Sequence, residues 1–277
     1  MTKPLAIDLC CGLGGWSSGL IAEGWDVTGY DIERHEYGEH RYPGTLVLQD
    51  VLTIDGSQFR DASLIVASPP CTEFSYMAMP WTRAKQIARA LRGEDEFPAG
   101  YRGSRTVADL TALFDACFRI QREASAAAGR HIPMVVENVK GAQPWVGRAR
   151  AHYGSFYLWG DVPALMPIAK AIKVATMGAG WYPPGHPKHV PGLGFNTHAE
   201  RGIKNAGRLT NAAEHADGRK GGGDWFGSGA NCSVQRRAGS KSTARKAASA
   251  LIAKIPETLA RHIGATFHPD RLGEVAA

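Results

Sequence analysis

Long apolar runs are missing from this 277-residue chain, and no stretch approaches the roughly 20 uninterrupted apolar residues that a membrane-spanning helix needs. The first residues also lack the apolar core of a secretory signal peptide, so we expect a cytoplasmic protein with no membrane partner. Cysteine is scarce: there are five, an odd number, and Cys10 and Cys11 are adjacent. This is a poor basis for a disulfide framework, so a special cysteine here is judged as a nucleophile or a metal ligand.

Charge is modest over the whole chain, with a formal net charge of +6, but it is unevenly distributed. The segment Met177 to Lys246 holds eleven basic and four acidic residues, a net charge of +7, which leaves −1 for the rest. A basic, solvated loop region would account for this. A near-neutral body with one basic, glycine-rich segment more specifically indicates a polyanionic partner.

Short apolar runs alternate with longer amphipathic stretches in the first half of the chain. Strands are predicted at Leu5–Leu9, Asp26–Tyr30, Thr45–Leu48, Leu64–Ala67 and Met134–Val136, and helices at Trp16–Glu23, Thr106–Ala128 and Ala244–Ile263. This alternation predicts an α/β fold with a mostly parallel, doubly wound sheet. Cys117 falls on the apolar face of the second helix, which predicts a core position.

Two stretches interrupt this pattern. Tyr76–Arg105 is basic and has no clear period, and it follows a strand end, where active-site loops occur. Met177–Lys241 is rich in turn-forming residues and poor in periodicity. Both are predicted to be loop regions, and the last predicted helix is expected to return to the main core.

A glycine-rich turn separates the first predicted strand from the first predicted helix. The segment Asp8-Leu-Cys-Cys-Gly-Leu-Gly-Gly15 would let a ligand approach the backbone at a helix N-terminus. Asp31 ends the second strand, and its distance from Gly12 fits the roughly 20 residues of a nucleoside-binding fingerprint, in which the acid binds ribose hydroxyls. Glycine turns also serve plain strand–helix packing, so this pattern alone leaves both interpretations open.

A cysteine stands at the end of the fourth predicted strand, in Ser68-Pro-Pro-Cys-Thr-Glu-Phe-Ser75. Two prolines stiffen the segment, and the carboxyl ends of the strands are where ligands bind in such sheets. Glu137, in Val136-Glu-Asn-Val139, ends the fifth strand at the same edge. A nucleophilic thiol and a carboxyl group are thus predicted beside an adenosine pocket.

These segments resemble the DNA (cytosine-5) methyltransferase family, in a compact form of the kind found in phages and bacteria. The cofactor signature matches Asp8–Trp16, the Pro-Pro-Cys-x-x-Phe-Ser signature matches Pro69–Ser75, and the Glu-Asn-Val signature matches Glu137–Val139. The resemblance covers residues 1 to about 150. It implies a Rossmann-like methyltransferase sheet that binds S-adenosylmethionine, with a catalytic domain at 1–172, helix 244–277 returning to it, and a small, irregular DNA-recognition domain at 173–243.

Site residues follow from the resemblance. Those expected to bind the cofactor are Asp8, Leu9, Cys10, Gly12, Gly14, Gly15, Trp16, Asp31, Ile32, Asp50, Val51 and Pro69. Those expected to be catalytic are Ser68, Pro70, Cys71, Glu137, Asn138 and Arg150. Those expected to contact double-stranded DNA are Ser75, Arg83, Lys85, Arg236 and Arg237. The implied reaction is methylation of C5 of a flipped-out cytosine through a covalent bond between Cys71 and C6, with Glu137 at N3 and Arg150 at O2.

Two elements depart from the family pattern. The Arg-x-Arg element matches only Arg148-Ala-Arg150, which comes unusually soon after Glu137, and two solvated arginines are an equally good interpretation. The late Gly-Asn-x-Val-Pro-Pro element, which closes the cofactor pocket, is only echoed by Ala253-Lys-Ile-Pro-Glu257.

Other functions remain open at this point. RNA (tRNA) cytosine-5 methylation would use the same chemistry, and a non-catalytic module that binds S-adenosylmethionine and DNA is a further alternative. An amino-methyltransferase is disfavoured, because Cys71 stands where its aromatic residue belongs. A zinc site is also disfavoured, since no close pair of ligands anchors His186, His189, His198 and Cys232. The sequence implies no restriction endonuclease partner and defines no oligomeric state.

Overall fold

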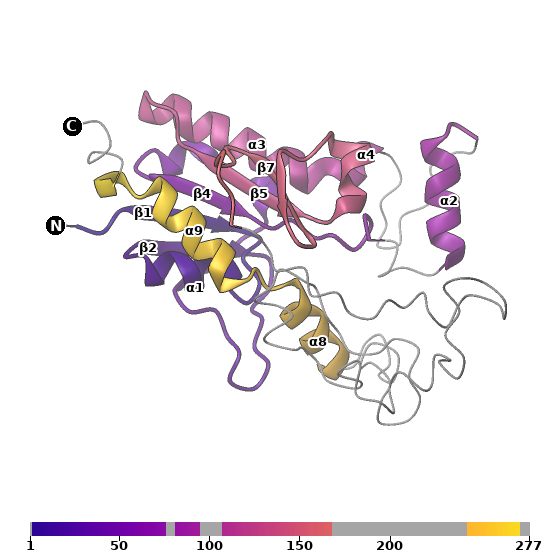
Figure 1. The fold of residues 1–277 in the computed structure, drawn as a ribbon, viewed down its shortest axis with the longest axis horizontal. Helices are drawn as coiled ribbons and strands as arrows, with labels where there is room; N and C mark the ends of the chain where they lie inside the picture. Colours follow the sequence, from indigo (N-terminus) through magenta and orange to yellow (C-terminus); the bar gives the residue numbers. More distant parts are fainter. Residues whose placement is uncertain (1, 76–80, 95–106, 168–242, 272–277) are drawn as a thin grey trace, which may run out of the picture.

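A single mixed sheet forms the centre of the molecule, as the computed structural model of residues 2–75, 81–94, 107–167 and 243–271 shows (Figure 1). Its strands are β1 (Leu5–Leu9), β2 (Asp26–Asp31), β3 (Thr45–Leu48), β4 (Leu64–Ala67), β5 (Met134–Asn138), β6 (Ala151–Tyr153) and β7 (Phe156–Gly160). Their order is β3-β2-β1-β4-β5-β7-β6, and all are parallel except β7, which is antiparallel to both neighbours. The predicted Rossmann-like α/β sheet is confirmed.

Helices cover both faces of this sheet (Figure 1). Helix α3 (Val107–Ala128) covers one face, and α1 (Gly15–Ala22) with α9 (Glu257–Phe267) covers the other. The other helices are α2 (Trp81–Leu91), α4 (Gln143–Val146) and α8 (Thr243–Ala253), with single turns η1 (Val51–Thr53), η2 (Gly56–Phe59) and η3 (Lys140–Ala142). Ile7 of β1 packs with Ile120 of α3 on one face, and its neighbour Ala6 packs with α1 and α9 on the other. Successive residues of a strand point to opposite faces, so the apolar run of β1 serves two cores.

The order of the strands reverses between β1 and β4. β2 and β3 continue from β1 in one direction, whereas β5, β7 and β6 continue from β4 in the other. In open α/β sheets, ligands bind in the crevice outside the carboxyl ends of the strands at such a reversal. The glycine turn after β1 and the Pro-Pro-Cys segment after β4 therefore flank the expected binding crevice.

Three local predictions need correction. The segment Tyr76–Arg105 is not all loop: it contains α2, whose only large apolar residue with a described side chain is Ile87, so the helical period was too weak to identify. The predicted helix Ala244–Ile263 is two helices, α8 and α9, because Pro256 lacks an N–H group and takes extended backbone angles before α9. The hairpin of β6 and β7 was not predicted.

The remaining predictions on organisation fall partly outside the described residues. Helix α9 does return to the core, where Leu259 and Ile263 are fully buried. The proposed recognition domain at 173–243 lies outside the described residues apart from its last residue, so this division stays a prediction. No helix in the described part of the chain has the length and apolar character that crossing a membrane requires.

Helices α1 and α9 touch at a glycine. A Cβ atom on Gly19 of α1 would overlap the Cβ atom of Ala260 and lie 2.7 Å from the backbone nitrogen of Arg261. Nearby, the Trp25 indole donates a hydrogen bond to the carbonyl of Gly264 at 3.0 Å. The absence of a side chain at Gly19 thus sets how closely the two helices pack.

Gly19→Ala tests this contact, because helix propensity and close packing predict opposite signs for the change in the free energy of unfolding. Helix propensity alone favours alanine over glycine by about 1 kcal/mol. We expect the variant to be destabilised instead, by roughly 1–3 kcal/mol, because the added methyl group overpacks the interface with α9. Urea unfolding of both proteins gives the answer, and a more stable Gly19→Ala protein would contradict the close packing.

Candidate active site

The glycine turn between β1 and α1 contains glycines of two kinds. Gly12, at φ 51°, has nothing within 4 Å of the position where a Cβ atom would lie. A Cβ atom on Gly14 would overlap the ring of Pro43, and one on Gly15 would overlap the backbone of Ile255. Gly12 therefore leaves room for a ligand at the backbone, whereas Gly14 and Gly15 allow close packing within the protein.

Asp31 lies directly against this turn. Its Oδ2 atom accepts a hydrogen bond from the backbone N–H of Gly12 at 2.9 Å, and Oδ1 accepts one from Glu33 at 3.2 Å. Burial would raise the pKa of Asp31, but the contact with His35 and these two backbone donors bring it below the ordinary value. The carboxylate is thus anionic and beside the open glycine, as the binding of ribose hydroxyls requires.

The segment after β3 lies beside Asp31 as well. The backbone N–H of Gln49 donates to the carbonyl of Asp31 at 2.8 Å, and Oδ1 of Asp50 accepts from the backbone N–H of Leu52 at 2.9 Å. Arg119 of α3 donates to the carbonyl of Leu52 at 3.3 Å, which holds the segment against the helix. Among the described residues, Leu52 contacts only Oδ1 of Asp50, which leaves Oδ2 as an acceptor for a ligand.

These surroundings fit an adenosine group. Gly12 and Asp31 supply backbone space and a carboxylate, and Asp50 supplies a second acceptor nearby. Ile32 is 72% exposed directly after Asp31, so an apolar surface is available for a flat base. The donor set and the open glycine agree with the expected binding of S-adenosylmethionine.

Other residues predicted to bind the cofactor lie deeper in the protein. Leu9, Trp16, Val51 and Pro69 are buried, and Cys10 is half-buried with φ 53°, a left-handed conformation that is costly for a residue with a side chain. Trp16 instead connects the first turn of α1 to the segment after β4, because its indole donates to Oγ of Ser68 at 3.0 Å.

Asp8 is fully buried beneath α1 and does not line the crevice. Its Oδ2 atom accepts from the Ser17 hydroxyl at 2.6 Å, and the Tyr42 hydroxyl lies 2.6 Å from the same Ser17 oxygen. Oδ1 has no hydrogen-bond partner among the described residues. Burial raises the pKa of Asp8 to about 8, so the group is mainly protonated at neutral pH. Asp8 therefore supports the turn from below.

Cys71 lies in a tight turn just beyond β4. Its carbonyl accepts from the backbone N–H groups of Phe74 at 3.0 Å and Ser75 at 2.9 Å. The residue is half-buried, whereas Cys11 and Cys117 are buried. The core position predicted for Cys117 is confirmed, and Cys71 is reachable from the carboxyl edge of the sheet.

The Pro-Pro-Cys segment is fixed by a residue of β5. Asn138, fully buried, donates through Nδ2 to the carbonyl of Pro69 at 2.9 Å. Glu137, directly before it, is 4% exposed at the carboxyl end of β5. Gly141 then passes so close to the carbonyl of Phe74 that a side chain would not fit. Asn138 and Ser68 thus hold the chain around Cys71, which is a positioning role.

Arg148 and Arg150 are both exposed, and the structure does not bring them to Glu137. The backbone N–H of Arg150 donates to the carbonyl of Leu158 at 2.9 Å, and Leu158 lies opposite Glu137 in the sheet. Arg150 is thus two strands from Glu137, roughly 10 Å at the usual spacing of strands. Its predicted contact with the base stays a prediction.

The predicted DNA contacts fall into three groups. Lys85 is exposed on α2, and Ser75 is half-buried. Arg83 is 7% exposed and forms an ion pair of 3.0 Å with Glu73, and its predicted contact with DNA stays a prediction. Nothing in the sequence around Arg83 indicates that its side chain is buried. Arg236 and Arg237 lie outside the described residues, as do the four candidate zinc ligands.

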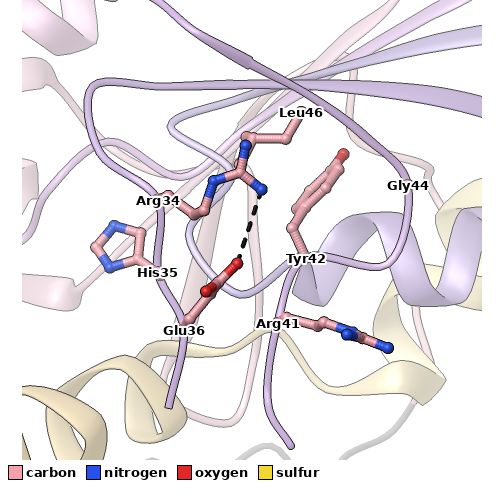
Figure 2. Close-up of a pocket in the computed structure, with 7 residues that line it drawn as sticks. All are labelled: Arg34, His35, Glu36, Arg41, Tyr42, Gly44 and Leu46. Atoms are coloured by element: carbon pink, nitrogen blue, oxygen red, sulfur yellow. Dashed lines mark ion pairs between the residues drawn. The ribbon is translucent and has the colours of Figure 1, made fainter. Parts of the chain in front are cut away.

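A cavity of about 150 Å³ lies elsewhere, along the connection between β2 and β3 (Figure 2). Figure 2 shows Arg34 directed towards Glu36, with 3.7 Å between Nη1 and Oε1, and the ring of Tyr42 on the opposite side. His35, another lining residue, lies 3.6 Å from Oδ1 of Asp31. The cavity thus lies beside Asp31, and Cys71 is not among its lining residues.

Comparison with known proteins gives one match by sequence. Residues 5–83 match the family model described as C-5 cytosine-specific DNA methylase, which confirms the resemblance predicted from the motifs around Asp8 and Cys71. No protein of curated function matches the chain.

Solved structures similar to this chain include three methyltransferases. An E. coli prophage protein assigned as a DNA modification methyltransferase is 20% identical, with 50% of this chain and 33% of that chain covered and a TM-score of 0.31. S. pombe Dnmt2 methyltransferase is 14% identical, with coverages of 51% and 35% and a TM-score of 0.30. Entamoeba histolytica methyltransferase EhMeth is 15% identical, with coverages of 53% and 41% and a TM-score of 0.32. The matched region thus spans between a third and about two fifths of each of these proteins.

The buried Asp8 predicts a pH-dependent stability. A carboxyl group whose pKa is raised on folding binds its proton more tightly in the folded state. The stabilisation that this group contributes is therefore complete below about pH 4 and is lost as pH rises towards about 8. Asp8→Asn keeps the shape and stays neutral. Relative to wild type, this variant should become more stable between pH 5.5 and 8, by on the order of 2–3 kcal/mol.

Urea unfolding of both proteins at the two pH values measures this difference. If the difference in the free energy of unfolding between the two proteins does not change with pH, Asp8 is ionised in the folded protein.

Proposed function

We propose that this chain, which carries the pattern of the C-5 cytosine-specific DNA methylase family over residues 5–83, methylates C5 of cytosine in double-stranded DNA. The methyl donor would be S-adenosylmethionine, and the reaction would pass through a covalent bond between Cys71 and C6. The family match covers only part of the chain, so the substrate and the covalent step rest on the residues themselves.

One arrangement supports the proposal above all others. Cys71 follows β4 at the reversal of strand order, Glu137 ends the neighbouring strand β5, and Asp31 with Gly12 lies across the reversal after β1 and β2. A candidate nucleophile, a buried carboxyl group and a candidate adenosine site would therefore face one crevice. Asn138 joins two of these parts through its bond to Pro69.

Cys71 would act as the nucleophile. C5 of cytosine is weakly nucleophilic, but when the thiolate adds to C6, the electrons of the C5–C6 double bond move to C5. C5 would then form the bond to the methyl group as the bond between that carbon and the donor sulfur breaks, and the electron pair stays on the sulfur as S-adenosylhomocysteine leaves. A base removes the C5 proton, and the C6–S bond breaks as the double bond forms again. The thiolate of Cys71 is regenerated, and no oxidant or reductant is needed.

Glu137 would stabilise the ring during addition. Its carboxyl group, held at the end of β5, is suited to contact N3 and the exocyclic amine, where charge changes as the thiolate adds. Because Glu137 is only 4% exposed, such a contact would be stronger than it would be in water. Arg150, if it extends along the sheet edge, would contact O2.

The cofactor would be held by residues on the other side of the crevice. Asp31 would bind the ribose hydroxyls, Ile32 would pack against adenine, and Asp50 would accept from the adenine amino group. Gly12 would let the remaining part of the cofactor approach the backbone. When bound, S-adenosylmethionine supplies an electrophilic methyl group.

DNA is the polymer that we propose, and tRNA is the alternative for the same chemistry. A base in a stacked duplex cannot reach Cys71, so it must be flipped out at a cost of about a few kcal/mol. The basic segment Met177–Lys241, which lies outside the described residues, would contribute phosphate and base contacts that offset this cost.

Cys71→Ser should abolish methyl transfer and leave cofactor affinity nearly unchanged, because Cys71 supplies the nucleophile and not the adenosine site. Duplex DNA carrying 5-fluorocytosine at the target should trap the wild-type protein covalently, since no proton can leave C5. The same duplex with ordinary cytosine is the control. The target can be found by bisulfite sequencing of DNA from cells that express the protein.

Two results would count against this mechanism. A Cys71→Ser protein that still methylates would exclude Cys71 as the nucleophile. Trapping on a fluorinated tRNA, with none on any fluorinated duplex, would support the RNA alternative.

The basic segment can be tested through salt dependence. Removing a side chain that binds one phosphate should reduce the slope of log affinity against log salt by about 0.9 for duplex DNA. Neutralising Arg236 and Arg237 together should flatten this slope and weaken binding to all sequences, with no change in cofactor affinity. Lys85→Ala with Arg89→Ala is the matched comparison on α2, and a reduced slope in that variant alone would place the phosphate contacts there.

A further inference from the structure

A buried ion pair connects the turn that carries Cys71 to helix α2. Oε2 of Glu73 lies 3.0 Å from Nη2 of Arg83, and the two residues are 9% and 7% exposed. Oε1 of Glu73 has no hydrogen-bond partner among the described residues. Glu73 occupies a variable position of the Pro-Pro-Cys-x-x-Phe-Ser signature, two residues after Cys71.

A gain in folding stability does not by itself explain why this ion pair is buried here. Removing two charges from water is costly, and apolar residues of similar volume are often as stable or more stable in the same place. The cost is greater here because one carboxylate oxygen is buried without a partner among the described residues. Such pairs are best attested where they fix one packing arrangement among several.

The two partners belong to parts of the chain that would otherwise be weakly connected. Glu73 lies inside the turn closed by the carbonyl of Cys71, and that turn is fixed to β5 through Pro69 and Asn138. Arg83 belongs to α2, which stands beyond α4 in Figure 1. Among the described side chains of α2, the apolar contact is small, since the buried residues Ala84 and Ile87 pack against Trp145 of α4.

We propose that Glu73 is a positioning residue, which docks α2 on the nucleophile turn through Arg83 and thereby fixes the orientation of Cys71. The exposed residues Lys85 and Arg89 of the same helix would face the phosphates of the nucleic acid. Phosphate binding on α2 and the placement of the thiol are then coupled through one ion pair. The catalytic meaning of this coupling rests on the proposed function, whereas the docking does not.

Three variants distinguish an effect on the orientation of Cys71 from a general loss of folding. Glu73→Gln removes the charge and keeps the size, and Glu73→Leu with Arg83→Met replaces the pair by apolar residues that preserve packing. Glu73→Arg with Arg83→Glu exchanges the charges. Glu94→Gln is the matched control, because it breaks the exposed pair of Glu94 with Arg92 just beyond the same helix.

Two readouts do not depend on activity: the rate at which iodoacetamide alkylates Cys71, followed on its own peptide by mass spectrometry, and tryptic cleavage of the native protein after Lys85 and Arg89. Both should change by roughly 10- to 100-fold in Glu73→Gln and in the apolar pair, the size expected when a charged hydrogen bond is removed. The charge-exchanged variant should recover most of the change, and Glu94→Gln should resemble wild type.

Methyl transfer supplies the third readout. In Glu73→Gln and in the apolar pair, kcat should fall while the affinity for S-adenosylmethionine stays unchanged. Alkylation and cleavage rates equal to those of Glu94→Gln would overturn the proposal, as would a charge-exchanged variant that recovers nothing. If no variant or wild type transfers methyl groups, the proposed function fails, while alkylation and cleavage still decide the docking.

Discussion

Parallel strands place all their carboxyl ends at one edge, and in this chain the order of the strands reverses between β1 and β4. The helices that follow β1 and β4 must then leave the sheet on opposite sides, so the two loops separate and a crevice opens between them. Every part of the candidate site depends on this constraint. The proposed adenosine side is built from the ends of β1, β2 and β3, and the proposed nucleophile side from the ends of β4 and β5.

A hydrogen bond joins these two sides, and a second one fixes the nucleophile side to itself. The Trp16 indole of α1 donates to Ser68 after β4, and Asn138 of β5 donates to the carbonyl of Pro69 after β4. Two successive prolines offer no backbone donors, so this part of the chain cannot hold itself by local hydrogen bonds and relies on such partners. Each bond gains strength in a buried setting, and each would leave a costly unpaired group if its partner were removed.

The sequence predicted those features that follow from local pattern. The five parallel strands, the glycine turn and the position of Asp31 at the end of the second strand all follow from apolar runs and from one spacing of 19 residues. Features that depend on distant partners could not be predicted. Asp8 belongs to a cofactor signature, yet Ser17 and Tyr42 make it a buried support. No pattern along the chain indicates that Arg83 would meet Glu73.

The contact of the glycine turn with the end of the chain has a consequence for how the protein is made. Gly15 packs on the backbone of Ile255, and Gly19 packs on Ala260, so 240 residues separate the partners in synthesis. A nascent chain still on the ribosome would hold β1 and α1 without their cover, with Trp16 and Leu20 open to water. Contacts this distant also slow folding. The protein would therefore acquire a rigid glycine turn only after the segment containing α9 has left the ribosome, and shortened translation products would be exposed to proteases.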